Sequence, residues 1–274
     1  MSRHNHPAII PAVLPPLPRV TRWKRNLPAA AAVTWLREGW EDFRVKPATS
    51  LTYGVLVFLV SLTFIGGLFR LGLDYILFPA LAGFMVVGPL IAIGLYEKSR
   101  RIAAGESISL SRMIFVQPRS GPQILFTGVL LCLLMLLWMR AAVIIYALFF
   151  GLLPFPGLSH VASVLVTTPT GWAMLIVGTS VGGLFAAFSF ATSAYAIPML
   201  LEERVDALTA MGTSVAVVGQ NLRPMLAWGG TVLALFVLSL ATGLLGLVVV
   251  FPVLGHGTWH AYRTLRPRRD ARGP

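Results

Sequence analysis

Two histidines near the end of the chain have the spacing of a binding pair. His256 and His260 are four residues apart, so on a helix they share one face, with Arg263 after them. Imidazoles at this spacing can hold a metal ion, but such sites usually need a third or fourth ligand. Glu97 and Asp206 would supply it if their segments meet at one end of the molecule. The alternative is a polar helix end at a membrane surface. With only two firm ligands, we assign no metal and no other cofactor.

Arg140 is the second candidate, because it lies inside a long apolar run. It is eleven residues before Gly151, near the middle of a bilayer at a rise of about 1.5 Å per residue. A charge there costs about 2.5–3.5 kcal/mol, so it should face the bundle interior, water or an acidic partner. It either contacts an anion or gates a path, or it is a structural arginine bonded to carbonyl oxygens. The other members of this candidate path carry hydroxyl groups: Tyr146, Ser189, Thr192 and Ser193.

The sequence does not indicate any of the common classes of enzyme. We expect no catalytic signature of the HExxH, GxSxG, Walker or CxxC type, and the single cysteine, Cys132, cannot form an internal disulfide. Serine and threonine hydroxyls on the apolar runs also bond to their own helix backbone, which needs no catalytic explanation. We therefore predict a protein without enzymatic activity.

The composition indicates that these residues are held within a membrane-embedded fold. The chain is 56% hydrophobic and only 12% charged, whereas soluble domains average about 45–50% and about 25%. Lipid must cover the excess apolar surface. The net charge of +12 does not indicate nucleic-acid binding, because all but two of the 22 Lys and Arg lie in four stretches beside apolar runs: 1–50, 96–121, 200–224 and 259–274. Basic loops of this kind face the cytoplasm.

The lengths of the apolar runs predict six transmembrane helices. A span needs about 20 residues. The last apolar segment, 225–254, is long for one span, and dividing it at Thr242–Gly243 keeps the basic C-terminus on the cytoplasmic side. The predicted fold is all-α, with both termini cytoplasmic and six helices as three hairpins: Ala48–Phe69, Tyr75–Tyr96, Pro122–Phe150, Gly171–Leu201, Pro224–Thr242 and Leu244–Tyr262.

A threefold pattern accompanies the hairpins. Each outgoing helix begins at a proline, Pro47, Pro122 or Pro224, after a semi-polar stretch that suggests a short interfacial helix. Trp35–Phe43 is the clearest amphipathic candidate, able to lie in the headgroup plane or to dock on the bundle. The uncharged stretch 151–170 suggests a partly buried cap, a re-entrant segment or an ordered interfacial loop. The predicted divisions are a disordered Pro-rich tail (1–34), a six-helix domain (35–266) and a basic tail (267–274).

Four motifs resemble a bacterial family of predicted integral membrane proteins, domain of unknown function 2189. They are GWEDFRVKPATSLTYG (39–54), PLIAIGLYEKSRR (89–101), RAAVIIYALFFG (140–151) and GHGTWHAYR (255–263). The resemblance covers roughly residues 35–266. It implies a six-helix protein of the bacterial inner membrane and carries no reaction.

Two functions fit these observations. The leading hypothesis is a membrane protein that handles a small solute or ion between its helices. The alternative is an accessory or assembly subunit of a larger membrane complex, such as a respiratory one. The expected partners are membrane lipid and, under the alternative, other membrane subunits; nucleic acid is not expected.

Overall fold

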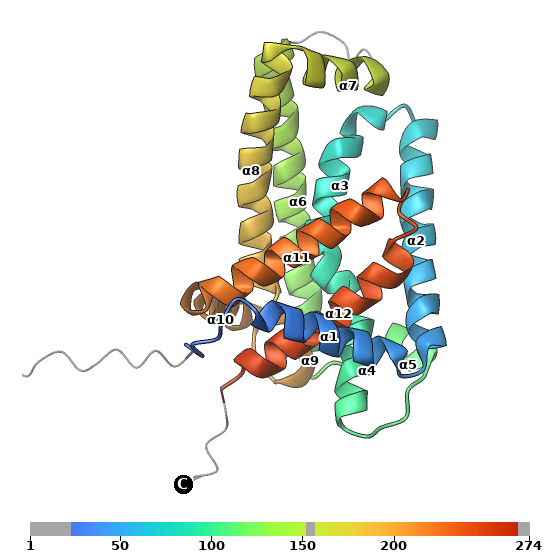
Figure 1. The fold of residues 1–274 in the computed structure, drawn as a ribbon, viewed down its shortest axis with the longest axis vertical. Helices are drawn as coiled ribbons and strands as arrows, with labels where there is room; N and C mark the ends of the chain where they lie inside the picture. The colour runs from blue at the N-terminus through green and yellow to red at the C-terminus, as the bar shows by residue number, and fades with distance from the viewer. Residues whose placement is uncertain (1–22, 152–156, 268–274) are drawn as a thin grey trace, which may run out of the picture.

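A computed structural model describes residues 23–151 and 157–267, and within them every regular element is helical. Figure 1 shows long helices standing side by side above a layer of shorter ones. The predicted tails, 1–34 and 267–274, lie largely outside the described residues. The helices are α1 (Ala31–Arg44), α2 (Pro47–Arg70), η1 (Asp74–Ile76), α3 (Leu77–Ile91), α4 (Ile93–Ala103), α5 (Leu110–Ile114), α6 (Gly121–Phe150), α7 (Leu158–Thr167), α8 (Pro169–Ser193), α9 (Ala196–Glu202), α10 (Ala207–Gln220), α11 (Leu222–Ala241) and α12 (Leu247–Leu265).

The three prolines predicted to begin the outgoing helices each lie in the first turn of a helix. Pro47 is the first residue of α2, Pro122 the second of α6 and Pro224 the third of α11. Proline suits this turn because its missing N–H would have no intrahelical acceptor there. A shorter helix precedes each: α1, α5 and α10. The repeated order of short helix and long helix is thus present in the structure.

Five helical segments are long and apolar enough to cross a membrane. They are 47–70, 74–103, 121–150, 169–202 and 222–241, and each overlaps one of the first five predicted spans. The sixth predicted span, Leu244–Tyr262, coincides with α12, which is not among the five. Two histidines, Pro252 and Arg263 interrupt its apolar character. Figure 1 shows α11 and α12 inclined relative to α6 and α8.

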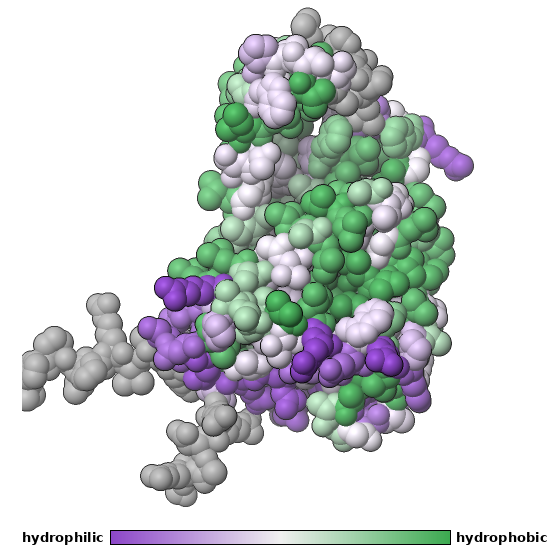
Figure 2. Space-filling model, viewed as in Figure 1, coloured by the Kyte–Doolittle hydropathy of each residue, from purple (hydrophilic) through white to green (hydrophobic). Residues whose placement is uncertain are grey.

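The surface is divided into an apolar and a polar zone. Figure 2 shows apolar residues over the middle of the molecule, less hydrophobic residues at its upper end, and a band of polar residues towards its base, around α1 and the lower end of α12. Large exposed side chains in the apolar zone include Leu125, Leu148 and Leu184. This division is the one expected of a bundle with its long helices in lipid and its basal layer at a headgroup surface.

The amphipathic helix α1 is docked on the bundle, one of the two alternatives for it. Trp35 and Phe43 are buried, whereas Trp40 is 45% exposed. The Trp35 ring meets Trp228 of α11 edge to face, with 6.0 Å between centroids. A Cβ on Gly39 would lie 2.6 Å from the backbone nitrogen of Gly257, so α1 lies directly against the backbone of α12. These contacts place the acidic face of α1 beside the histidines of α12.

The segment 151–170 contains a helix. Within its described part, α7 runs from Leu158 to Thr167 and lies across the upper end of α8 (Figure 1). Thr168 caps the following helix, since its hydroxyl accepts a hydrogen bond from the Gly171 N–H at 3.0 Å. The short helix and its cap place this segment at the end of the bundle opposite to the polar layer.

Candidate functional site

His256 lies at the centre of a buried hydrogen-bonded chain. Its Nε2 is 3.0 Å from the Ser50 hydroxyl of α2, and its Nδ1 is 2.8 Å from the Ser99 hydroxyl of α4. The ammonium of Lys98 donates to Ser50 at 2.7 Å. The side chains of Ser50, Lys98, Ser99 and His256 are all buried. Three helices that are distant in sequence, α2, α4 and α12, therefore meet at this ring.

A second row of polar groups reaches the surface through α1. The Oδ2 of Asp42 lies 2.8 Å from Nε2 of His260. The other ring nitrogen of His260, Nδ1, lies 3.3 Å from Oε2 of Glu38. The Glu38 side chain is 35% exposed. Asp42, His260 and Glu38 thus form a row that ends at a carboxylate in contact with solvent.

Asp42 is held in its charged form. Burial alone would raise the pKa of this carboxyl, but the hydrogen bond from His260, the nearby polar side chain of Ser99 and the attraction of both histidines outweigh it. The result is a pKa below the ordinary value of 3.8. Asp42 is therefore a carboxylate acceptor at neutral pH.

The predicted polar cluster is only partly brought together. His256 belongs to the buried chain and His260 to the second row, whereas Arg263 is exposed. Asp206 is the N-cap of α10, accepting from the Thr209 N–H at 2.9 Å. The side chain of Thr209 and then its N–H lower the pKa of the Asp206 carboxyl. No group of three or more potential metal ligands occurs in the described residues.

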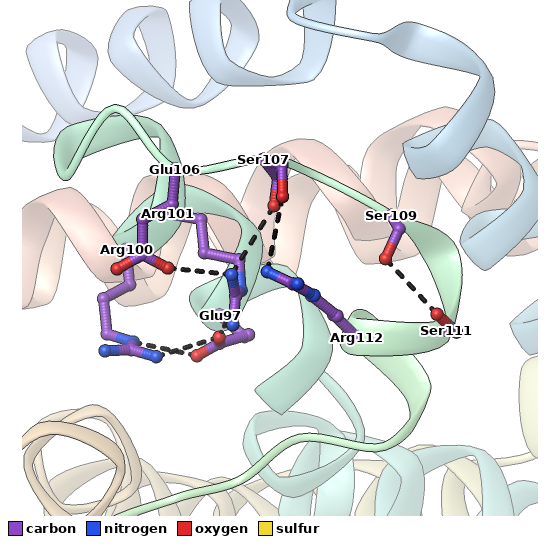
Figure 3. Close-up of polar contacts among 8 residues, drawn as sticks. All are labelled: Glu97, Arg100, Arg101, Glu106, Ser107, Ser109, Ser111 and Arg112. Carbon is purple, nitrogen blue, oxygen red and sulfur yellow. Dashed lines mark hydrogen bonds and ion pairs between the residues drawn. The ribbon is translucent and has the colours of Figure 1, made fainter.

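Glu97 faces away from the histidines into a separate ionic cluster. Its carboxylate is 2.8 Å from Nε of Arg100 and 2.6 Å from Nε of Arg101. Figure 3 shows Arg101 reaching on to Glu106 and Ser107, with Arg112 at the same serine. Two acids and three arginines thereby hold the α4–α5 connection together. Glu97 pairs with arginines of this cluster and not with the histidines.

Arg140 and the hydroxyl residues do not form one path. Arg140 is exposed on α6, and Tyr146 is partly buried on the same helix. Ser189 is buried and donates to the carbonyl oxygen of Val86 at 3.1 Å. Thr192 and Ser193 donate to carbonyl oxygens of their own helix. The hydroxyls thus have backbone partners, as membrane serines and threonines often do.

A cavity lies between α3, α8, α11 and α12, with a volume of about 100 Å³. Its wall is almost entirely apolar and includes Gly88, Ala186 and Phe236. Trp228 also lines it, and its indole Nε1 is one of two buried side-chain atoms in the described structure that lack a hydrogen-bond partner. Arg140 does not line this cavity. A buried N–H without an acceptor is costly. The Nε1 atom has no accessible surface on the cavity, so an occupant would reach it only after the indole ring turns.

The expected absence of a GxSxG pattern is wrong. Residues 178–182, GTSVG, match this pattern of serine hydrolases. That pattern requires a sharp strand-to-helix turn, but Ser180 lies inside α8 and donates to the carbonyl of Ile176 at 2.7 Å. The match is therefore a small-residue stretch of an α-helix.

The comparisons with known proteins agree with the resemblance noted above. The model of a family described as "Predicted integral membrane protein (DUF2189)" matches residues 77–202. These residues include two of the four motifs, 89–101 and 140–151. No protein with a curated description and no solved structure matches the chain. Together with the apolar helices, the match identifies an integral membrane protein with several membrane-spanning helices.

Proposed function

We propose that the protein binds a small solute in the cavity between α3, α8, α11 and α12, without chemically changing it. The observation that carries the proposal is the almost entirely apolar cavity wall; one of its residues, Trp228, has an indole N–H without a hydrogen-bond partner in the described structure. Apolar pockets with a few polar groups are the usual form of a small-molecule site. The solute we expect has an apolar body and one hydrogen-bond acceptor, such as a carbonyl.

The first test fills the cavity. Gly88 lines it, and a Cβ built there meets no atom within 4 Å, so Gly88→Leu should occupy the space without a backbone clash. We expect it to weaken binding of the probe 2-nonanone at least about tenfold, because a methyl ketone supplies both the chain and the acceptor. Binding is measured from the 15N–1H signal of the Trp228 indole, assigned with Trp228→Phe, in detergent-solubilised protein.

Two controls make this result specific. Gly178 of α8 also has open space around its Cβ position but does not line the cavity, so Gly178→Leu should bind the ketone normally. Nonane lacks the carbonyl and should leave the indole signal near its free position. A ketone response that survives in Gly88→Leu, or that is lost equally in both variants, rules out this cavity as the site.

We further propose six crossings of a bacterial inner membrane, arranged as three hairpins with both termini cytoplasmic. The distribution of basic residues supports this orientation. After Cys132→Ser, single cysteines at Ser2, Thr242 and Pro274 test it with a membrane-impermeant maleimide on intact spheroplasts. Thr242→Cys should react, and the two terminal variants should react only after lysis. Labelling of one terminus alone from outside would establish an odd number of crossings.

An accessory role in a larger membrane complex is the second candidate. One observation favours it: only 6% of the apolar window in segment 169–202 is buried, and α8 exposes Trp172, Ile176 and Phe188. Another membrane subunit would cover such a face, as lipid would. Purification in mild detergent distinguishes the two. Stoichiometric co-elution of a specific membrane protein, lost in Ile176→Ser, supports the subunit role; elution alone supports solute binding.

A further inference from the structure

The cavity has a basal end, towards the polar layer, that lies beside aromatic residues. Along α4, α8 and α12 the lining residues advance towards the base, and the last of each series are Tyr96, Ala194 and Thr258. Figure 1 shows these helices running down to α9 and the lower end of α12. Tyr195 follows Ala194 directly in the chain, and Trp259 follows Thr258. The groups next to the basal end of the cavity are therefore aromatic rings.

These rings pack against one another as an aromatic plug, formed by Tyr195, Trp259 and Tyr262. The ring centroids of Tyr195 and Tyr262 are 4.8 Å apart, and those of Trp259 and Tyr262 are 5.4 Å apart. All three side chains are buried. The Tyr262 hydroxyl donates to Oε2 of Glu202 at 2.9 Å, and Nη1 of Arg266 binds the same oxygen at 2.7 Å. The plug thus separates the basal end of the cavity from a polar surface cluster.

The segment before α1, residues 23–25, lies across the plug and is called the strap below. The ring of Trp23 meets that of Tyr195 edge to face, with 6.3 Å between centroids. The buried side chain of Asn221 binds the strap through its backbone: Oδ1 accepts from the Arg25 N–H at 2.9 Å, and Nδ2 donates to the Trp23 carbonyl at 2.8 Å. One side-chain amide therefore holds the strap against the ring that closes the plug.

The remaining bonds of the strap are long or incomplete. Gln220 accepts from the Trp23 N–H at 3.2 Å, and Nε of Arg25 donates to the Leu265 carbonyl at 3.2 Å. The buried Nη2 of Arg25 has no hydrogen-bond partner in the described structure, which is costly for an N–H group. Asn26, the next residue, has a φ of 52°, a conformation that is unfavourable for residues other than glycine. A segment held in this way can open locally while the helices stay folded.

We propose that the strap is a gate for the cavity. While Asn221 holds it, Trp23 keeps the aromatic plug in place and the basal end of the cavity is closed. Release of the strap frees the Tyr195 ring to turn aside and connects the cavity to water. The inference rests on the proposed function for what passes through the gate, but opening and closing need no solute.

The test measures how fast a thiol at the basal end of the cavity reacts with a sulfonated maleimide. In a Cys132→Ser background, Ala194→Cys places one thiol where the natural residue is buried and lines the cavity. The protein is held in lipid nanodiscs, and the charged reagent reaches the thiol only from water. Trp23→Ala removes the contact with Tyr195, and Asn221→Ala removes both hydrogen bonds to the strap backbone. Each should raise the labelling rate about tenfold or more, because access follows the free energy of local opening.

Two controls separate gating from general loosening. Lys24 belongs to the strap but is exposed, so Lys24→Ala should leave the labelling rate unchanged. Ala80 of α3 is buried and does not line the cavity, so Ala80→Cys, used in place of Ala194→Cys, should stay unreactive in both strap variants. An unchanged rate at position 194 in both Trp23→Ala and Asn221→Ala, or an equal acceleration at position 80, overturns the gate. Faster labelling at position 194 alone, in a protein that does not bind 2-nonanone, supports the gate and contradicts only the solute proposal.

Discussion

Replacing Gly54 with leucine should destabilise the protein by about 3 kcal/mol or more. Gly54 of α2 lies against the backbone of α12, and a Cβ at this position would overlap the carbonyl group of Val248. Backbone cannot move aside as a flexible side chain does, so the two helices would have to separate. That separation would also disturb Ser50, one turn earlier on α2, and its hydrogen bond to His256. We expect the thermal midpoint in detergent, followed by circular dichroism, to fall by about 10 °C.

Gly66 provides the matched control on the same helix. A Cβ there meets nothing within 4 Å, so Gly66→Leu has the same gain in helix propensity and no clash. It should be neutral or slightly stabilising. If Gly54→Leu and Gly66→Leu lose stability equally, the loss is a general effect of leucine on α2. The close approach of α2 to α12 at Gly54 is then contradicted.

Replacing Asp42 with leucine should have an effect of similar size, about 3–5 kcal/mol, through a different mechanism. The substitution removes the hydrogen-bond acceptor of His260 and leaves the buried ammonium of Lys98 without an opposing charge. The neighbouring acid Glu41 is the control, since it is exposed and pairs only with Arg37 one turn away. Glu41→Leu should change stability by less than about 1 kcal/mol.

The contribution of Asp42 should also depend on pH in a definite direction. The folded-state pKa of this carboxyl is lowered below 3.8, through hydrogen bonds that outweigh burial. The unfolded chain therefore binds the proton more readily, and stability falls as the pH falls. The native protein should have a higher free energy of unfolding than Asp42→Asn. This difference should be largest above about pH 5 and should shrink as the pH falls below the pKa of Asp42 in the unfolded chain. If the difference in free energy of unfolding grows as the pH is lowered, Asp42 is not the carboxylate acceptor.

Helix positions were predictable because they depend on local chemistry. Apolar run length and the prolines at 47, 122 and 224 are sufficient to locate α2, α6 and α11. The spacing of His256 and His260 also indicated a shared helical face. The α12 segment was harder, because its apolar run contains a proline, histidines and glycines that serve tertiary contacts with α1, α2 and α4 rather than lipid.

The sequence by itself determined that this chain is an integral membrane protein with a basic surface, because composition, run length and charge distribution act locally and need no partner. Only the tertiary structure decided which polar residues meet. Nothing in the spacing of Lys98 and His256, or of Asp42 and His260, indicates that they share hydrogen bonds. Their contacts depend on α1 packing against the backbone of α12 at Gly39 and on α4 packing against Gly255. The same packing turned Glu97 towards arginines and left Arg140 on the outer surface of α6.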